Sequence, residues 1–144
     1  SYGVPGLRLG VLASADKELI EWMRKDVAIW NINSFAEFYM QIFGKYEDDY
    51  RQASRLFVEE RARFQKELSA ISWLRVIPSQ ANYFLCEVLD KYTSKDLLKL
   101  LLIKYGVLIK DCSTKSGFEG RNYIRIAVRG KADNDKLVES LKKL

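Results

Sequence analysis

One long amphipathic segment constrains the fold of this chain more than any other feature. Apolar side chains recur along it at steps of three, four or seven residues, whereas the opposite face, from Glu47 to Lys66, is charged. This spacing predicts a single helix with one buried face, of the kind that bridges two domains or lies along one edge of a sheet. The apolar stripe consists of Tyr46, Tyr50, Ala53, Phe57, Phe64, Leu68 and Ile71.

Shorter patterned segments on both sides of this helix predict an α/β chain. Cap residues mark several boundaries, including a Thr93–Asp96 capping box and a terminating Gly106. Strands with helices packed on one face form a two-layer unit. The predicted strands are 11–13, 74–77, 81–88, 107–109 and 123–129. The predicted shorter helices are 19–27 after caps at 14–16, 34–43 with a Ser34–Glu37 capping box, 93–105, and 132–144.

Composition limits the classes of function that this chain can have. Its 144 residues are 48% hydrophobic, which suits one globular domain or a domain with a connecting arm. No run approaches the roughly 18 apolar residues of a membrane helix, so we expect no membrane contact. The net charge of +5 comes from basic residues interleaved with acidic ones, and therefore we expect no nucleic-acid partner.

The absence of histidine and the presence of two cysteines exclude several kinds of catalytic and metal site within this chain. There is no histidine, which excludes Ser-His-Asp and Cys-His triads and ordinary histidine-bearing zinc sites. Cys86 and Cys112 both lie in apolar runs and are interpreted as small buried hydrophobic residues. We therefore expect no metal.

A glycine-rich segment at the start of the chain surrounds one arginine. Gly3, Gly6 and Gly10 permit tight turns and close backbone approach around Arg8, with Pro5 between them. In such a setting a guanidinium can be directed at a buried anion. The alternative is a solvated arginine at the edge of a strand.

This opening resembles the segment after the Schiff-base lysine of fold-type I pyridoxal-phosphate (PLP) aminotransferases. Their pattern is Ser-Lys-x-x-Gly-x-x-Gly-x-Arg-x-Gly, and the lysine itself would stand immediately before Ser1. Residues 78–84, 106–112 and 123–126 are similar, in the same order, to segments of the histidinol-phosphate aminotransferase group. That group reads Gly-Ile-x-x-Arg-Asp, a loop, and x-Leu-Arg-Ile in the last two segments.

The resemblance implies the C-terminal part of such an enzyme. Its expected regions are a remnant of the large PLP-binding domain at 1–33, a long interdomain helical region at 34–71, and a small α/β domain at 72–144. The small domain would be a two-layer unit with a small sheet and helices on one face.

The resemblance also implies roles for five residues. Arg8 would bind the PLP phosphate, and Arg125 the α-carboxylate of the substrate. Lys110 stands where relatives often carry an arginine that meets a distal phosphate, whereas Asn33 and Asn82 would lie at the mouth of the cleft. Plain solvent exposure is the alternative for Arg125 and Lys110, and capping or packing is the alternative for the two asparagines.

By the same resemblance the parent enzyme would transfer an amino group between an amino acid and a 2-oxo acid, with or without a phosphate on the substrate. We expect a cytoplasmic homodimer that uses PLP. Because the Schiff-base lysine lies outside these 144 residues, the chain holds no catalytic residue and should be inactive alone. A decarboxylase of the threonine-phosphate decarboxylase kind, which the sequence also resembles, is the first alternative. The second is a non-catalytic binding or assembly module, and the residue encoded before Ser1 would distinguish it from an enzyme.

Overall fold

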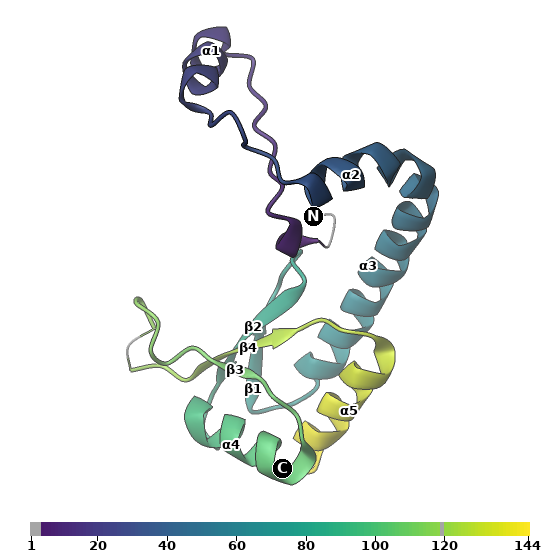
Figure 1. Cartoon of the computed structure of the whole chain (residues 1–144). Helices are drawn as coiled ribbons and strands as arrows, with labels where there is room; N and C mark the ends of the chain where they lie inside the picture. The colour runs from purple at the N-terminus through teal and green to yellow at the C-terminus, as the bar shows by residue number, and fades with distance from the viewer. Residues whose placement is uncertain (1–3, 119) are drawn as a thin grey trace. The chain divides into compact units, whose positions relative to one another are not determined.

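The computed structural model describes residues 4–118 and 120–144. Gly3 of the opening motif and Glu119 of the predicted loop lie outside the described residues. The chain divides into two compact units, one ending at Ser54 and the other from Arg55 to Leu144. The boundary falls within α3 (Glu47–Ser69), the long helix that the apolar stripe predicts (Figure 1).

The first unit is helical. It holds the 3-10 turn η1 (Pro5–Leu7), α1 (Lys17–Asp26), α2 (Ser34–Phe43), the 3-10 turn η2 (Gly44–Tyr46) and the start of α3. Asp16 caps α1 by accepting a hydrogen bond from the backbone N–H of Leu19 at 3.0 Å, as predicted.

Two local predictions in this unit are wrong. The cap of α2 is Asn33 and not Ser34, because the amide oxygen of Asn33 accepts the N–H of Ala36 at 3.0 Å. Residues 11–13 form no strand, and Val11 is 88% exposed. A strand needs a neighbour to accept and donate backbone hydrogen bonds, and within the described residues this segment has none.

The second unit is built on a four-stranded antiparallel sheet. Its order is β1-β2-β4-β3, so the strand that comes last in the chain lies inside the sheet. The strands are β1 (Leu74–Ile77), β2 (Tyr83–Val88), β3 (Lys110–Asp111) and β4 (Tyr123–Ala127). Two helices, α4 (Ser94–Tyr105) and α5 (Lys131–Lys142), complete the unit together with the rest of α3 (Figure 1).

The strand expected at 107–109 lies further along the chain. Helix α4 ends at Gly106, whose φ of 63° is left-handed, as its predicted role requires. The N–H of Val107 then donates to the carbonyl of Leu101 at 3.1 Å, so this donor belongs to the helix cap and not to a sheet. Pairing with β4 starts only where Lys110 stands opposite Arg125.

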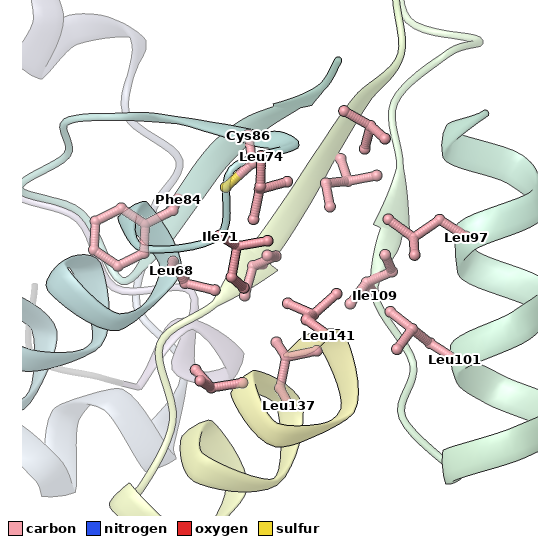
Figure 2. Packing of buried hydrophobic residues seen from close by; sticks show 14 of the residues in the cluster. Leu68, Ile71, Leu74, Phe84, Cys86, Leu97, Leu101, Ile109, Leu137 and Leu141 are labelled. Atoms are coloured by element: carbon pink, nitrogen blue, oxygen red, sulfur yellow. The ribbon is translucent and has the colours of Figure 1, made fainter. Parts of the chain in front are cut away.

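The core fills the space between one face of the sheet and the helices. Alternate residues of β2, namely Phe84, Cys86 and Val88, are buried there. Figure 2 shows Phe84 and Cys86 in one cluster with helix residues, which include Leu68, Leu97, Leu101, Leu137 and Leu141. The expected two-layer unit with helices on one face is confirmed. Both cysteines are buried and unbridged, and burial raises the pKa of the Cys86 thiol to about 12.

The opposite face of the sheet, called here the outer face, carries the other set of alternating side chains. It carries most of the polar and charged side chains of the sheet, together with three apolar ones, Ile77, Leu85 and Ala127. Its members are Arg75, Ile77, Tyr83, Leu85, Glu87, Lys110, Tyr123, Arg125 and Ala127.

A buried asparagine joins α3 to α5. Asn134 is 2% exposed, and its amide nitrogen donates to a carboxylate oxygen of Glu60 at 2.7 Å and to the carbonyl of Arg129 at 2.8 Å. Its amide oxygen accepts the N–H of Arg129 at 3.0 Å. Arg63 completes the junction through ion pairs to Glu60 and Asp135, each at 2.7 Å. Among the described residues, no helix has the length and apolar character needed to cross a bilayer.

Candidate functional site

Arg8 has an unusual backbone conformation. It ends η1 with φ 54° and ψ 31°, and it is the sole non-glycine residue with positive φ in the part of the chain that the structure describes. Its N–H donates to the carbonyl of Pro5 at 3.1 Å. A left-handed conformation costs an L-residue roughly 1–2 kcal/mol. Such strain concentrates at functional positions, and it supports the selection of Arg8 from the motif.

Asn33 holds the backbone next to Arg8. Its amide nitrogen donates to the carbonyl of Leu7 at 2.8 Å, while its amide oxygen caps α2. One side chain therefore fixes η1 to the start of α2 within the first unit. Both the amide nitrogen and the amide oxygen of Asn33 are thus engaged within the chain, which favours a capping role over substrate binding. The contact of Asn33 with a substrate stays a prediction.

Among the described residues, the guanidinium of Arg8 has no carboxylate partner. Arg8 is also exposed. Its planar fork of N–H donors matches two oxygens of a phosphate. The fixed backbone and the unpaired fork together form a candidate phosphate site.

In the second unit, two cations face each other across the sheet. Lys110 of β3 stands directly opposite Arg125 of β4, and both are exposed on the outer face. Like charges in this cross-strand relation are destabilising. Neither residue forms an ion pair with a carboxylate among the residues described. By contrast, Arg75 on the same face is neutralised by Glu87, whose carboxylate accepts its Nε at 2.8 Å.

Asp111, the carboxylate nearest in sequence, forms no ion pair with either cation among the residues described. Asp111 accepts the N–H of Ser113 at 2.9 Å on one oxygen and the hydroxyl of Ser113 at 2.8 Å on the other. Partial burial acts to raise the pKa of Asp111, but these hydrogen bonds, together with the hydroxyl of Ser94 and the positive charge of Lys110, outweigh it and hold the pKa below its ordinary value. The two oxygens are therefore engaged in the loop after β3.

Sequence reasoning missed the residue that contacts Arg125. The guanidinium carbon of Arg125 lies 5.3 Å from the ring centroid of Tyr83, within cation–π range. Tyr83 pairs with Ala127 and Leu85 pairs with Arg125, so the ring is a diagonal neighbour on the outer face. The aromatic type was visible in the sequence, but its relation to Arg125 required the register of β2 and β4.

Asn82 lies at the entry to β2. Its carbonyl accepts the N–H of Val128 at 2.9 Å, which extends the β2–β4 ladder by one residue, and the residue is exposed. The structure thus brings Lys110 and Arg125 together in the second unit and Arg8 and Asn33 together in the first. The ligand role of each stays a prediction.

Comparison with known proteins identifies relatives of this chain. The family described as "Aminotransferase class I and II" matches residues 1–141. The chain is 35% identical over 143 residues to the L-serine phosphate decarboxylase of Campylobacter jejuni, with 97% of this chain and 36% of that protein covered. It is 34% identical over 144 residues to the threonine-phosphate decarboxylase of Salmonella typhimurium, with 98% and 38% covered.

A solved structure shows the same fold. The histidinol-phosphate aminotransferase of Clostridium acetobutylicum superimposes with a TM-score of 0.83 at 30% identity, over 98% of this chain and 42% of that one. The chain thus spans about two fifths of the length of these relatives, as expected for part of a larger PLP enzyme. The family is PLP-dependent. The chain therefore belongs to the class I and II aminotransferases, the PLP-dependent family that its motifs resemble.

Proposed function

We propose that these residues belong to a PLP-dependent enzyme that acts on an amino acid carrying a phosphate group. One observation carries this proposal: Lys110 and Arg125 oppose each other on the outer face without an ion-pair partner among the described residues. A ligand with a carboxylate at one end and a phosphate at the other would neutralise both cations. Two relatives support this substrate class, since their names specify serine phosphate and threonine phosphate. Histidinol phosphate, in the name of a third, shares the phosphate but has no carboxylate.

The chain's own residues fit the cofactor. PLP, when bound, supplies an electron sink for bonds broken at the substrate Cα. Arg8 would hold the PLP phosphate, because its exposed guanidinium fork suits two phosphate oxygens and Asn33 fixes the backbone beside it through the carbonyl of Leu7. This phosphate contact is the part of the cofactor site that the described residues can provide.

Arg125 and Lys110 would bind opposite ends of the substrate. A guanidinium binds a carboxylate through two parallel N–H donors, so Arg125 would fix both the position and the plane of the α-carboxylate. Lys110 would meet the distal phosphate as a compact charge without a planar fork. Because the placement of the carboxylate decides how the Cα bonds are aligned, Arg125 bears on the choice of reaction as well as on binding.

Two reactions at Cα remain candidates. Amino transfer to a 2-oxo acid is the reaction of the family's histidinol-phosphate aminotransferases, one of which shares the fold at a TM-score of 0.83. Loss of the carboxylate as carbon dioxide is favoured by a separate observation, the identities of 35% and 34% to two phospho-amino-acid decarboxylases. On a phosphorylated amino acid, both reactions would use the same two cationic anchors, Lys110 and Arg125.

The test uses the intact protein loaded with PLP. O-Phosphoserine and O-phosphothreonine are supplied, and carbon dioxide release is measured beside amino transfer to 2-oxoglutarate. Lys110→Gln should lower kcat/KM for phosphorylated substrates roughly 10- to 100-fold, the size of one lost charge-assisted contact. The unphosphorylated amino acids should be unaffected. Lys99→Gln, an exposed lysine of α4, is the matched control. Equal kcat/KM values for wild type and Lys110→Gln on the phosphorylated substrates would contradict the proposal.

A further inference from the structure

We infer that Tyr83 is a positioning residue that holds the guanidinium of Arg125 in place for the substrate carboxylate. The inference rests on the proposed function, because it concerns how the same site binds its ligand. Tyr83 would not touch the reacting atoms and would act through Arg125.

The neighbours of Arg125 on the outer face differ in their effect on its charge. Leu85 stands opposite it on β2 and offers no polar group, and Lys110 stands opposite it on β3 and repels it. Glu87, a diagonal neighbour on β2, is engaged by Arg75, whereas the ring of Tyr83, the other diagonal neighbour, lies 5.3 Å from the guanidinium carbon and attracts it. The side chain is therefore drawn toward β2 and away from the lysine.

An aromatic ring holds an arginine without using its hydrogen-bond donors. The attraction acts between the positive charge and the π face, so the N–H fork stays available to a carboxylate. The contrast on the same face is Arg75, whose Nε donates to Glu87. A carboxylate partner would neutralise Arg125 before any substrate arrived. A tyrosine can order it and leave it charged.

Ordering the arginine in advance should matter for affinity. A long side chain that is free in the unbound protein loses rotamer freedom when the ligand binds, whereas one already held on a ring loses less. Removing the ring should therefore weaken binding of ligands that carry a carboxylate, by roughly 3- to 10-fold. Ligands without a carboxylate should be insensitive.

The experiment compares two probes that differ in the carboxylate alone. O-Phosphoserine and O-phosphoethanolamine are each mixed rapidly with the intact PLP-loaded protein, and their dissociation constants are taken from the amplitude of the first change in cofactor absorbance, before O-phosphoserine can lose carbon dioxide. Tyr83→Leu should raise the dissociation constant of O-phosphoserine roughly 3- to 10-fold and leave that of O-phosphoethanolamine unchanged. Tyr83→Phe keeps the ring and should restore wild-type affinity. If the leucine variant does not fold, Tyr83→Val replaces it, since β-branched residues favour strands.

The control variant is Tyr105→Leu, which removes a similar cation–π contact to Lys104 on α4, also at 5.3 Å, and should change neither constant. An equal loss for both probes in Tyr83→Leu, or no loss for either, would overturn the inference. A further variant, Arg125→Gln, distinguishes a failure of the proposed function from a failure of the inference about Tyr83. If it leaves O-phosphoserine binding unchanged, then the proposed function fails. If it weakens that binding while Tyr83→Leu does not, then the inference about Tyr83 alone fails.

Discussion

Replacing Asn134 with alanine should destabilise the second unit by about 3 kcal/mol. The side chain makes two hydrogen bonds to the backbone of Arg129 and one to the carboxylate of Glu60. Neutral bonds contribute about 1 kcal/mol each, and the bond to a charged group about 1.5–3 kcal/mol. The sum is near 4 kcal/mol. Water reduces the loss, because Asn134 and Arg129 line an open cavity of about 280 Å³ through which solvent can reach the backbone groups of Arg129.

The measurement is urea unfolding of the 144-residue chain followed by tryptophan fluorescence. Trp22→Phe and Trp30→Phe remove the two tryptophans of the first unit, so that Trp73, which packs against the core, reports on the second unit alone. Glu139→Ala is the control, since this exposed residue lies on the same helix and should change the free energy of unfolding by less than about 0.5 kcal/mol.

A third variant separates hydrogen bonding from packing. Asn134→Leu keeps most of the volume but leaves the partners at Arg129 and Glu60 unsatisfied, so it should lose at least as much stability as the alanine variant. If leucine restores wild-type stability, or if alanine costs less than about 1 kcal/mol, then the junction between α3 and α5 depends on packing and the reasoning is wrong.

Two other predictions concern stability. Gly106→Ala should cost about 1–2 kcal/mol, because its φ of 63° is left-handed, although a Cβ there would meet only the end of the Lys136 side chain, at 4.0 Å. Gly44→Ala, at φ −57°, should be neutral or stabilising, and circular dichroism during thermal unfolding compares the two variants. Hydrogen bonds from Arg63 hold the pKa of Glu60 below its ordinary 4.5. Glu60 therefore stabilises the folded state above about pH 4.5, and this stabilisation is lost as the pH falls further. Urea unfolding between pH 3 and 6 should show a shallower dependence in Glu60→Gln, and an identical profile would exclude the effect.

Local chemistry made much of this fold predictable. The Thr93–Asp96 box and Gly106 after α4 depend on residues within a few positions of one another, and both appear as expected. The long helix also forms, but its stripe is buried only in its later part, at Phe64 and Leu68, whereas Tyr46 lies in η2 and is 54% exposed. The sheet was harder. The backbone N–H of Val107 is engaged by the cap of α4 through the carbonyl of Leu101. Because this donor cannot pair with β4, β3 starts later than the apolar run 107–109 suggests. The side chain of Asn33, which caps α2, also donates to the carbonyl of Leu7, 26 positions earlier in the chain. This second bond could not be predicted from the residues around the cap.

The candidate site divides in the same way. Arg8 and Arg125 could be selected from motifs because each stands in a recognisable local pattern. The ring of Tyr83 could not, because its relation to Arg125 exists only in the register of β2 with β4. Asn134 lies in a polar stretch that reads as a solvated helix face, and its burial depends on contacts with α3 far upstream.

The two borders of the sheet have a practical consequence. β3 is two residues long, and both of its residues, Lys110 and Asp111, are charged, whereas β1 at the other border runs into Pro78. Short, charged or proline-ended border strands discourage strand addition by a second molecule and hence aggregation. Lys110 thus protects the unit against self-association as well as carrying its proposed phosphate contact. An apolar replacement there would risk precipitation that could be mistaken for lost binding, so a polar neutral residue is the sounder choice at this position.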